Sequence, residues 1–90
     1  MKYETDTFST SLGDLKITFI GHGSLMFQFN DIIIHLDPVS DMGDYSDLPK
    51  ADIILITHEH FDHFNADTVE MLRKDDTTII SNQACAPKIP

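Results

Sequence analysis

The segment THEHFDHFN, residues 57–65, is dense in side chains that bind metals. Four potential ligands fall within six consecutive positions, directly after the apolar run ADIILI: His58, His60, Asp62 and His63. Imidazole nitrogens and carboxylate oxygens are the usual protein ligands of zinc, iron and manganese. The cluster therefore predicts a metal site on a short segment that follows a strand.

The spacing of these ligands indicates two positions for metal ions. His58 and His60 are two residues apart just past a strand end, so in extended geometry their side chains emerge on the same side. Asp62 and His63 follow once the chain has turned. Two pairs of ligands side by side suit two ions about 3.5–4 Å apart, which activate a water molecule and polarise a scissile bond.

A different zinc motif can be excluded. The HExxH pattern of helical zinc proteases begins correctly at His58 and Glu59, but its last position is occupied by Asp62 instead of histidine. The apolar run before it also has the pattern of a strand and not of a helix.

The elements that must position the cluster can be read from hydrophobic periodicity. LKITFIGHG, from Leu15, predicts a strand that ends at a pair of glycines, and SLMFQFN and IIIHLDP predict a hairpin joined by Asn30 and Asp31. The polar stretch 39–50 predicts a surface loop.

The second half of the chain alternates between strand and helix patterns. ADIILI and TTIIS are apolar enough to predict strands buried on both faces. Between them, Asn65 is a candidate N-cap for a helix with Val69 and Leu72 on its apolar side and Arg73 and Lys74 at its end. NQACAPKIP predicts a further helix or loop. Together these elements predict an α/β fold, a mixed sheet with helical cover.

Composition limits the classes of partner. Ninety residues suffice for a single small domain, residues 1–90, and the formal charge of −9 disfavours binding to nucleic acids. Cys85 is the only cysteine, which excludes an internal disulfide and fits a cytoplasmic protein. No apolar run is long enough for a membrane span. A small-molecule substrate is the expected partner.

Three segments resemble the metallo-β-lactamase superfamily. THEHFDH resembles its HxHxDH signature, HLDP resembles its first motif with Asp37 at the strand end, and ITFIGHGSLMFQF is similar to one branch of hydrolases. That branch includes proteins like ascorbate-6-phosphate lactonase and N-acylphosphatidylethanolamine phospholipase D. The resemblance extends from about Lys16 to Asn82.

The resemblance implies a role for each residue of the motifs. His58 and His60 would bind a first metal ion, and Asp62 and His63 a second, with Asp62 also orienting the nucleophilic water. Asp37 would hold the ligand loop through hydrogen bonds without touching the metal. His22, in the flexible Gly21–Gly23 turn, would line the pocket as a further ligand or as a hydrogen-bond donor to a developing oxyanion.

The family fold is an αββα sandwich, of which this chain would be about the N-terminal half. The family also supplies a third histidine, a bridging aspartate and a final histidine, and none is recognisable after His63. We therefore expect either the N-terminal fragment of a longer hydrolase or a half that forms a homo-oligomer, in both cases with an exposed sheet face.

The implied function is metal-dependent hydrolysis of an ester, lactone or phosphodiester, with zinc as the first candidate metal and manganese or iron as alternatives. His60 stands where the flavodiiron oxidoreductases carry glutamate, which argues against that branch. An iron-dependent oxidoreductase of the dioxygenase type and a catalytically incomplete metal-binding module remain open. His35, at the end of an apolar strand, is expected to be structural.

Overall fold

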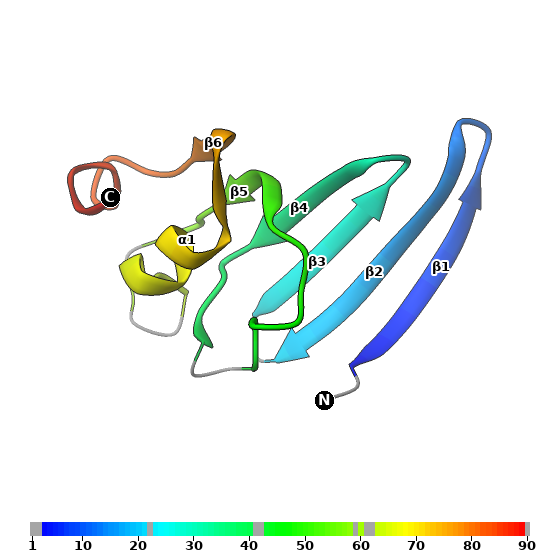
Figure 1. Cartoon of the computed structure of the whole chain (residues 1–90), viewed down its shortest axis with the longest axis horizontal. Helices are drawn as coiled ribbons and strands as arrows, with labels where there is room; N and C mark the ends of the chain where they lie inside the picture. The colour runs from blue at the N-terminus through cyan, green and yellow to red at the C-terminus, as the bar shows by residue number, and fades with distance from the viewer. Residues whose placement is uncertain (1–2, 22, 41–42, 59, 61–62, 90) are drawn as a thin grey trace.

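The computed structural model describes residues 3–21, 23–40, 43–58, 60 and 63–89, which form one mixed sheet with a helix packed against it (Figure 1). The six strands lie in the order β1-β2-β3-β4-β5-β6. Neighbours from β1 to β4 are antiparallel, whereas β4, β5 and β6 are parallel. The elements are β1 Glu4–Thr10, β2 Gly13–Gly21, β3 Ser24–Phe29, β4 Ile32–Leu36, β5 Ala51–Leu55, α1 Ala66–Leu72, β6 Arg73–Ile80 and the 3-10 helix η2 Ala86–Lys88.

The predicted hairpin is present as β3 and β4. Phe29 pairs with Ile32, so Asn30 and Asp31 make a two-residue connection. Asn30 has a φ of 53°, a left-handed conformation that asparagine tolerates better than most residues. The hairpin brings His35 opposite Met26, and the residue after β4, Asp37, contacts Thr57 at the start of the segment that carries the candidate ligands.

The predicted helix is also present, with the predicted cap. The Asn65 side chain accepts a hydrogen bond from the Thr68 backbone N–H at 3.0 Å, and Val69 and Leu72 are buried. The helix has seven residues, and no helix within the described residues is long and apolar enough to cross a membrane. In Figure 1, α1 lies at the β5–β6 side of the sheet, far from β1.

The expected basic end of this helix was wrong. Arg73 and Lys74 begin β6 instead, and the last turn of α1 carries no basic residue. The Lys74 backbone N–H donates to the Thr77 hydroxyl, and its ammonium group pairs with Asp52 on β5. Tertiary contacts with the neighbouring strand thus outweigh the local pattern, which favoured a helical position for Arg73 and Lys74.

The two faces of the sheet differ sharply in burial. The face under α1 holds the buried residues Thr18, Met26, His35 and Ile54. Cross-strand register places a second set of apolar strand residues on the opposite face, here called the open face, and none of this set is buried. Its members are Phe8, Leu15, Ile17, Phe19, Leu25, Phe27, Phe29, Ile32, Ile34, Leu36, Ile53, Leu55 and Ile80.

The open face corrects one expectation. ADIILI and TTIIS were expected to be buried on both faces, but in β5 Ile53 and Leu55 are only half-buried and in β6 Ile80 is 54% exposed. Their apolar runs match a strand that is covered on both sides, whereas the residues described by the structure cover one side only. Exposed apolar area of this extent is typical of a surface that packs against another layer.

Strand β1 was not predicted. Its sequence, ETDTFST, has one large apolar residue, and all seven residues are exposed. The strand exists through its pairing with β2, from Glu4 opposite Phe19 to Thr10 opposite Gly13. It forms an edge of the sheet, where charged residues such as Glu4 and Asp6 discourage pairing with another chain.

Candidate metal centre

The candidate site lies where two parallel strands end. Asp37 follows β4, and Thr57 and His58 follow β5, so the carboxyl ends of the two strands bring these residues to the same edge of the sheet. The Asp37 backbone N–H donates to the carbonyl of Leu55 at 2.8 Å, which continues the ladder one step beyond β4. Chain topology therefore juxtaposes residues that are 20 positions apart.

Asp37 is the centre of the hydrogen-bond network. It is 2% exposed, and its carboxylate accepts from the Thr57 backbone N–H at 2.7 Å, from the Thr57 hydroxyl at 2.6 Å and from His63 Nδ1 at 2.8 Å. The Ser24 hydroxyl donates to the Asp37 backbone carbonyl at 2.7 Å. Asp37 has a φ of 46°, a left-handed conformation held by these contacts.

His63 is brought to Asp37 by a turn in the ligand segment. The backbone N–H groups of His63 and Phe64 both donate to the His60 carbonyl, at 2.9 and 3.0 Å. The His63 ring also lies against Gly23 in the β2–β3 connection. A Cβ at Gly23 would be 2.7 Å from His63 Cε1, so only glycine leaves this ring its place.

Three imidazoles gather at this edge of the sheet. The His58 ring lies 4.1 Å from the His63 ring and 4.6 Å from the His60 ring, measured between centroids. Its Nδ1 lies 2.9 Å from the Thr57 hydroxyl. His58 and His63 are half-buried, and His60 is exposed. The rings thus present nitrogen donors from within one short segment.

These residues have the donor chemistry of a divalent metal site, although they do not enclose an ion by themselves. Asp62 and His22 lie outside the described residues, and so do their predicted roles. Among the residues that are described, no three or more His, Cys, Asp or Glu side chains converge tightly enough to hold an ion. Neighbouring imidazoles backed by a buried carboxylate fit zinc, manganese or iron.

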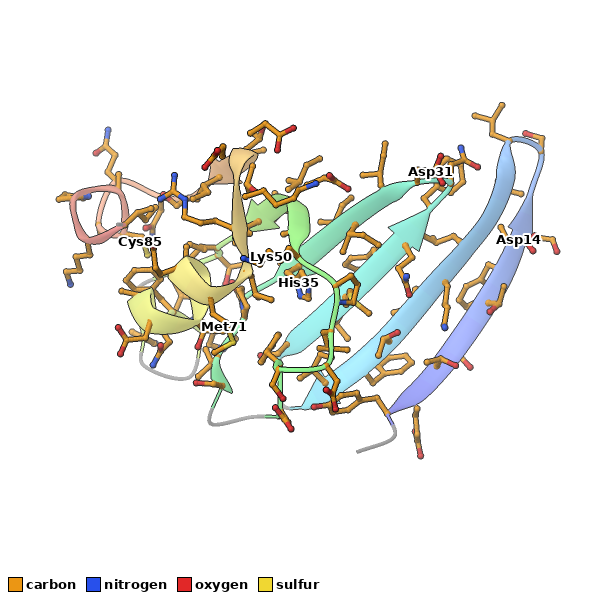
Figure 2. The ribbon with its side chains drawn as sticks, in the orientation of Figure 1. Asp14, Asp31, His35, Lys50, Met71 and Cys85 are labelled. Atoms are coloured by element: carbon orange, nitrogen blue, oxygen red, sulfur yellow. The ribbon has the colours of Figure 1, made fainter. Side chains whose placement is uncertain are left out.

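His35 is separate from this cluster. It is fully buried beneath the loop that carries Pro49 and Lys50 (Figure 2), and its Nε2 lies 2.9 Å from the Pro49 carbonyl. Burial lowers the pKa of His35, and the hydrogen bond to the Pro49 carbonyl opposes this shift. Its Nδ1 has no hydrogen-bond partner within the described residues, and its ring lies 5.7 Å from the ring of Tyr45.

Two residues of the site were not singled out from the sequence as contributors to it. Thr57 touches both Asp37 and His58, and Gly23 leaves room for His63. Thr57 directly precedes the cluster, which is the only local signal for its role. The sequence indicated Gly23 as part of a turn. Its contact with His63, 40 positions away, depends on the fold and has no local signal.

The fold is that of part of a metallo-β-lactamase-like protein, and the chain belongs to the beta-lactamase superfamily. The family described as the beta-lactamase superfamily domain matches residues 16–85. The expected family is therefore confirmed. So is the expected fold class, since the six-stranded mixed sheet with its helix corresponds to part of a metallo-β-lactamase-like fold.

Several similar proteins bear the name of metal-dependent hydrolases. A crystal structure from Parabacteroides distasonis, provisionally titled a metal-dependent hydrolase, is 47% identical with a TM-score of 0.93 over 98% of this chain and 40% of its own. A UPF0173 metal-dependent hydrolase of Salinibacter ruber is 31% identical over 76% of this chain, and one of a Geobacillus species is 35% identical over 74%. The chain spans about a third, 31%, of the length of these two curated relatives.

Proposed function

We propose that this protein acts in metal-dependent hydrolysis, using a metal-activated water on an ester, a lactone or a phosphodiester. The observation that carries the proposal is the network around Asp37. A buried carboxylate that holds histidines by their Nδ1 atoms is the usual support of metal-binding imidazoles, because it fixes the orientation of the ring. The names of the relatives agree with this class of reaction.

In this proposal the ligands fall into two pairs. His58 and His60 bind a first divalent ion, and Asp62 and His63 bind a second. Zinc is the first candidate because imidazole and carboxylate together suit it, and manganese and iron are the alternatives. Asp37 does not touch the metal but keeps the ligand segment in place through Thr57 and His63.

Each residue of the proposed site would have its own role in hydrolysis. A bound divalent ion would supply the positive charge that makes a water molecule more acidic and polarises the scissile bond. Asp62 orients this water and accepts its proton. His22 either donates a hydrogen bond to the developing oxyanion or adds a ligand. Asp37 prevents the rings of the ligand segment from rotating away.

Completion of the site is part of the proposal. The resemblance implies a third histidine, a bridging aspartate and a final histidine, which we expect from additional protein of the same fold or from a second copy in a homo-oligomer. The open face is the surface through which either would pack. A small-molecule substrate and a cytoplasmic location complete the proposal.

Native mass spectrometry after incubation with zinc tests the metal site. We expect one or two bound ions per subunit, with fewer in Asp62→Ala and an unchanged number in the control Asp75→Ala, an exposed carboxylate on β6. Hydrolysis of a panel of model esters, lactones and phosphodiesters should disappear in Asp62→Ala only. Retained hydrolysis in that variant, or oxygen consumption by the iron-loaded protein without hydrolysis, would contradict the proposal.

A further inference from the structure

We propose that Thr57 is a positioning residue that fixes the tautomer of His58, so that its Nε2 lone pair is directed to the metal. The consequence for metal binding rests on the proposed function, whereas the tautomer itself does not. Thr57 lies between Asp37 and His58, and its hydroxyl is within hydrogen-bond distance of both.

The direction of each hydrogen bond follows from counting protons. A carboxylate can only accept, so the Thr57 hydroxyl, 2.6 Å from Asp37 Oδ2, must donate its single proton there. The hydroxyl can then only accept at its second contact, 2.9 Å from His58 Nδ1. Nδ1 of His58 must therefore carry a proton, and in the neutral ring the lone pair resides on Nε2.

Asp37 thus fixes the tautomers of two histidine rings, one directly and one through Thr57. His63 donates its Nδ1 proton to Asp37 Oδ2 directly, at 2.8 Å, while His58 is set through the Thr57 hydroxyl. Both contacts end on the same carboxylate oxygen, which has two lone pairs to accept them. The two rings, whose centroids are 4.1 Å apart, consequently have the same tautomer.

The hydroxyl can be removed without disturbing the backbone contact. The Thr57 side chain is exposed, and its backbone N–H bonds to the other carboxylate oxygen of Asp37 at 2.7 Å, a contact that any residue except proline can make. Thr57→Val keeps the shape and β-branching of the side chain but lacks the hydroxyl that connects Asp37 with His58. Thr57→Ser keeps the hydroxyl.

Long-range ¹H–¹⁵N NMR of the metal-free protein, at a pH where imidazoles are neutral, reads the tautomer of each ring. We expect the Nδ1–H form for His58 in the wild type and in Thr57→Ser. In Thr57→Val the Nε2–H form of His58 should appear, while His63 keeps Nδ1–H. An Nε2–H form of His58 in the wild type, or an unchanged Nδ1–H form in Thr57→Val, would overturn the proposal.

Zinc titration gives the second readout. Thr57→Val should bind zinc roughly 10–100-fold more weakly, with affinity restored in Thr57→Ser and unchanged in the control Thr5→Val, an exposed threonine on the edge strand β1. Equal zinc affinity in wild type and Thr57→Val would refute the role toward the metal. Because the tautomer is measured without metal or substrate, a failure of the proposed hydrolysis leaves that result standing, and the two failures are distinguishable.

Discussion

Nδ1 of His63 lies 2.8 Å from Oδ2 of Asp37, a contact that spans 26 positions of the sequence and joins the end of β4 to the segment after β5. It ties the candidate ligand segment to the sheet. Thr57 adds two further contacts to the same carboxylate. The buried Asp37 side chain therefore contacts the ligand segment at two positions, Thr57 and His63, and several measurable consequences depend on these contacts.

Replacement of Asp37 should affect metal binding and stability to different degrees. Asp37→Asn keeps the volume of the side chain but replaces one carboxylate oxygen by an amide NH2 group, which cannot accept. At least one of the hydrogen bonds from Thr57 and His63 is then lost, and we expect zinc affinity to fall roughly 10–100-fold. Asp37→Ala leaves the buried donors without an acceptor and should lower the free energy of unfolding by about 2 kcal/mol. Zinc titration and urea denaturation measure the two effects. Wild-type zinc affinity in both variants would contradict this role of Asp37.

A methyl group at Gly23 should displace His63. In Gly23→Ala the added Cβ would lie 2.7 Å from Cε1 and 3.3 Å from Nδ1 of His63, so the ring must move and its bond to Asp37 must lengthen. We expect zinc affinity to fall roughly 10-fold. In a double-mutant cycle with His63→Ala, Gly23→Ala should have no additional effect. Additive losses would show that Gly23 acts elsewhere.

His35 should make stability fall in mild acid. Burial lowers its pKa below the ordinary 6.5, so as pH drops below that value the unfolded chain takes up a proton that the folded protein resists. The free energy of unfolding therefore falls with decreasing pH from about 6.5 toward the folded-state pKa, by at most about 1.4 kcal/mol per pH unit.

The control for this effect is His35→Gln, which can still donate to the Pro49 carbonyl but does not titrate. Urea denaturation at a series of pH values should give a smaller slope for His35→Gln than for the wild type. Every group other than residue 35 is the same in the two proteins. Identical slopes would contradict a contribution of His35 to the acid sensitivity.

The cap of α1 should stabilise the protein measurably. The Asn65 side chain accepts from the Thr68 backbone N–H, so Asn65→Ala should lower the free energy of unfolding by about 1 kcal/mol. Asn65→Asp retains an acceptor and should restore most of this loss. Urea denaturation of the three proteins is the measurement, and equal stabilities would argue against the cap.

The open face should drive self-association. Phe19, 42% exposed on β2, belongs to this face, whereas Leu12, 78% exposed in the β1–β2 turn, does not. In sedimentation velocity experiments, Phe19→Gln should weaken concentration-dependent association, and the matched control Leu12→Gln should leave it unchanged. A wild-type protein that stays monomeric at all concentrations would contradict this expectation.

Local spacing was sufficient for much of the fold. The alternation in β2, the two-residue connection at Asn30 and the cap at Asn65 are each encoded by neighbouring residues, which explains why they could be predicted. The crowding of His58, His60, Asp62 and His63 similarly predicted a metal site, and the motifs around it predicted the family. Those ligand roles stay a prediction.

Distant contacts decided the rest. β1 forms because it can pair with β2. Arg73 and Lys74 lie in β6 and not in the helix because Arg73 pairs with Ala51 of β5 and the ammonium group of Lys74 pairs with Asp52. The exposure of one side of β5 and β6 could not be deduced from their apolar runs. Such a run predicts burial but does not identify the segment that packs on it. The relay from Asp37 through Thr57 to His58 likewise exists only because parallel strands end at the same edge of a sheet, and a hydrogen bond requires its two atoms to meet in space.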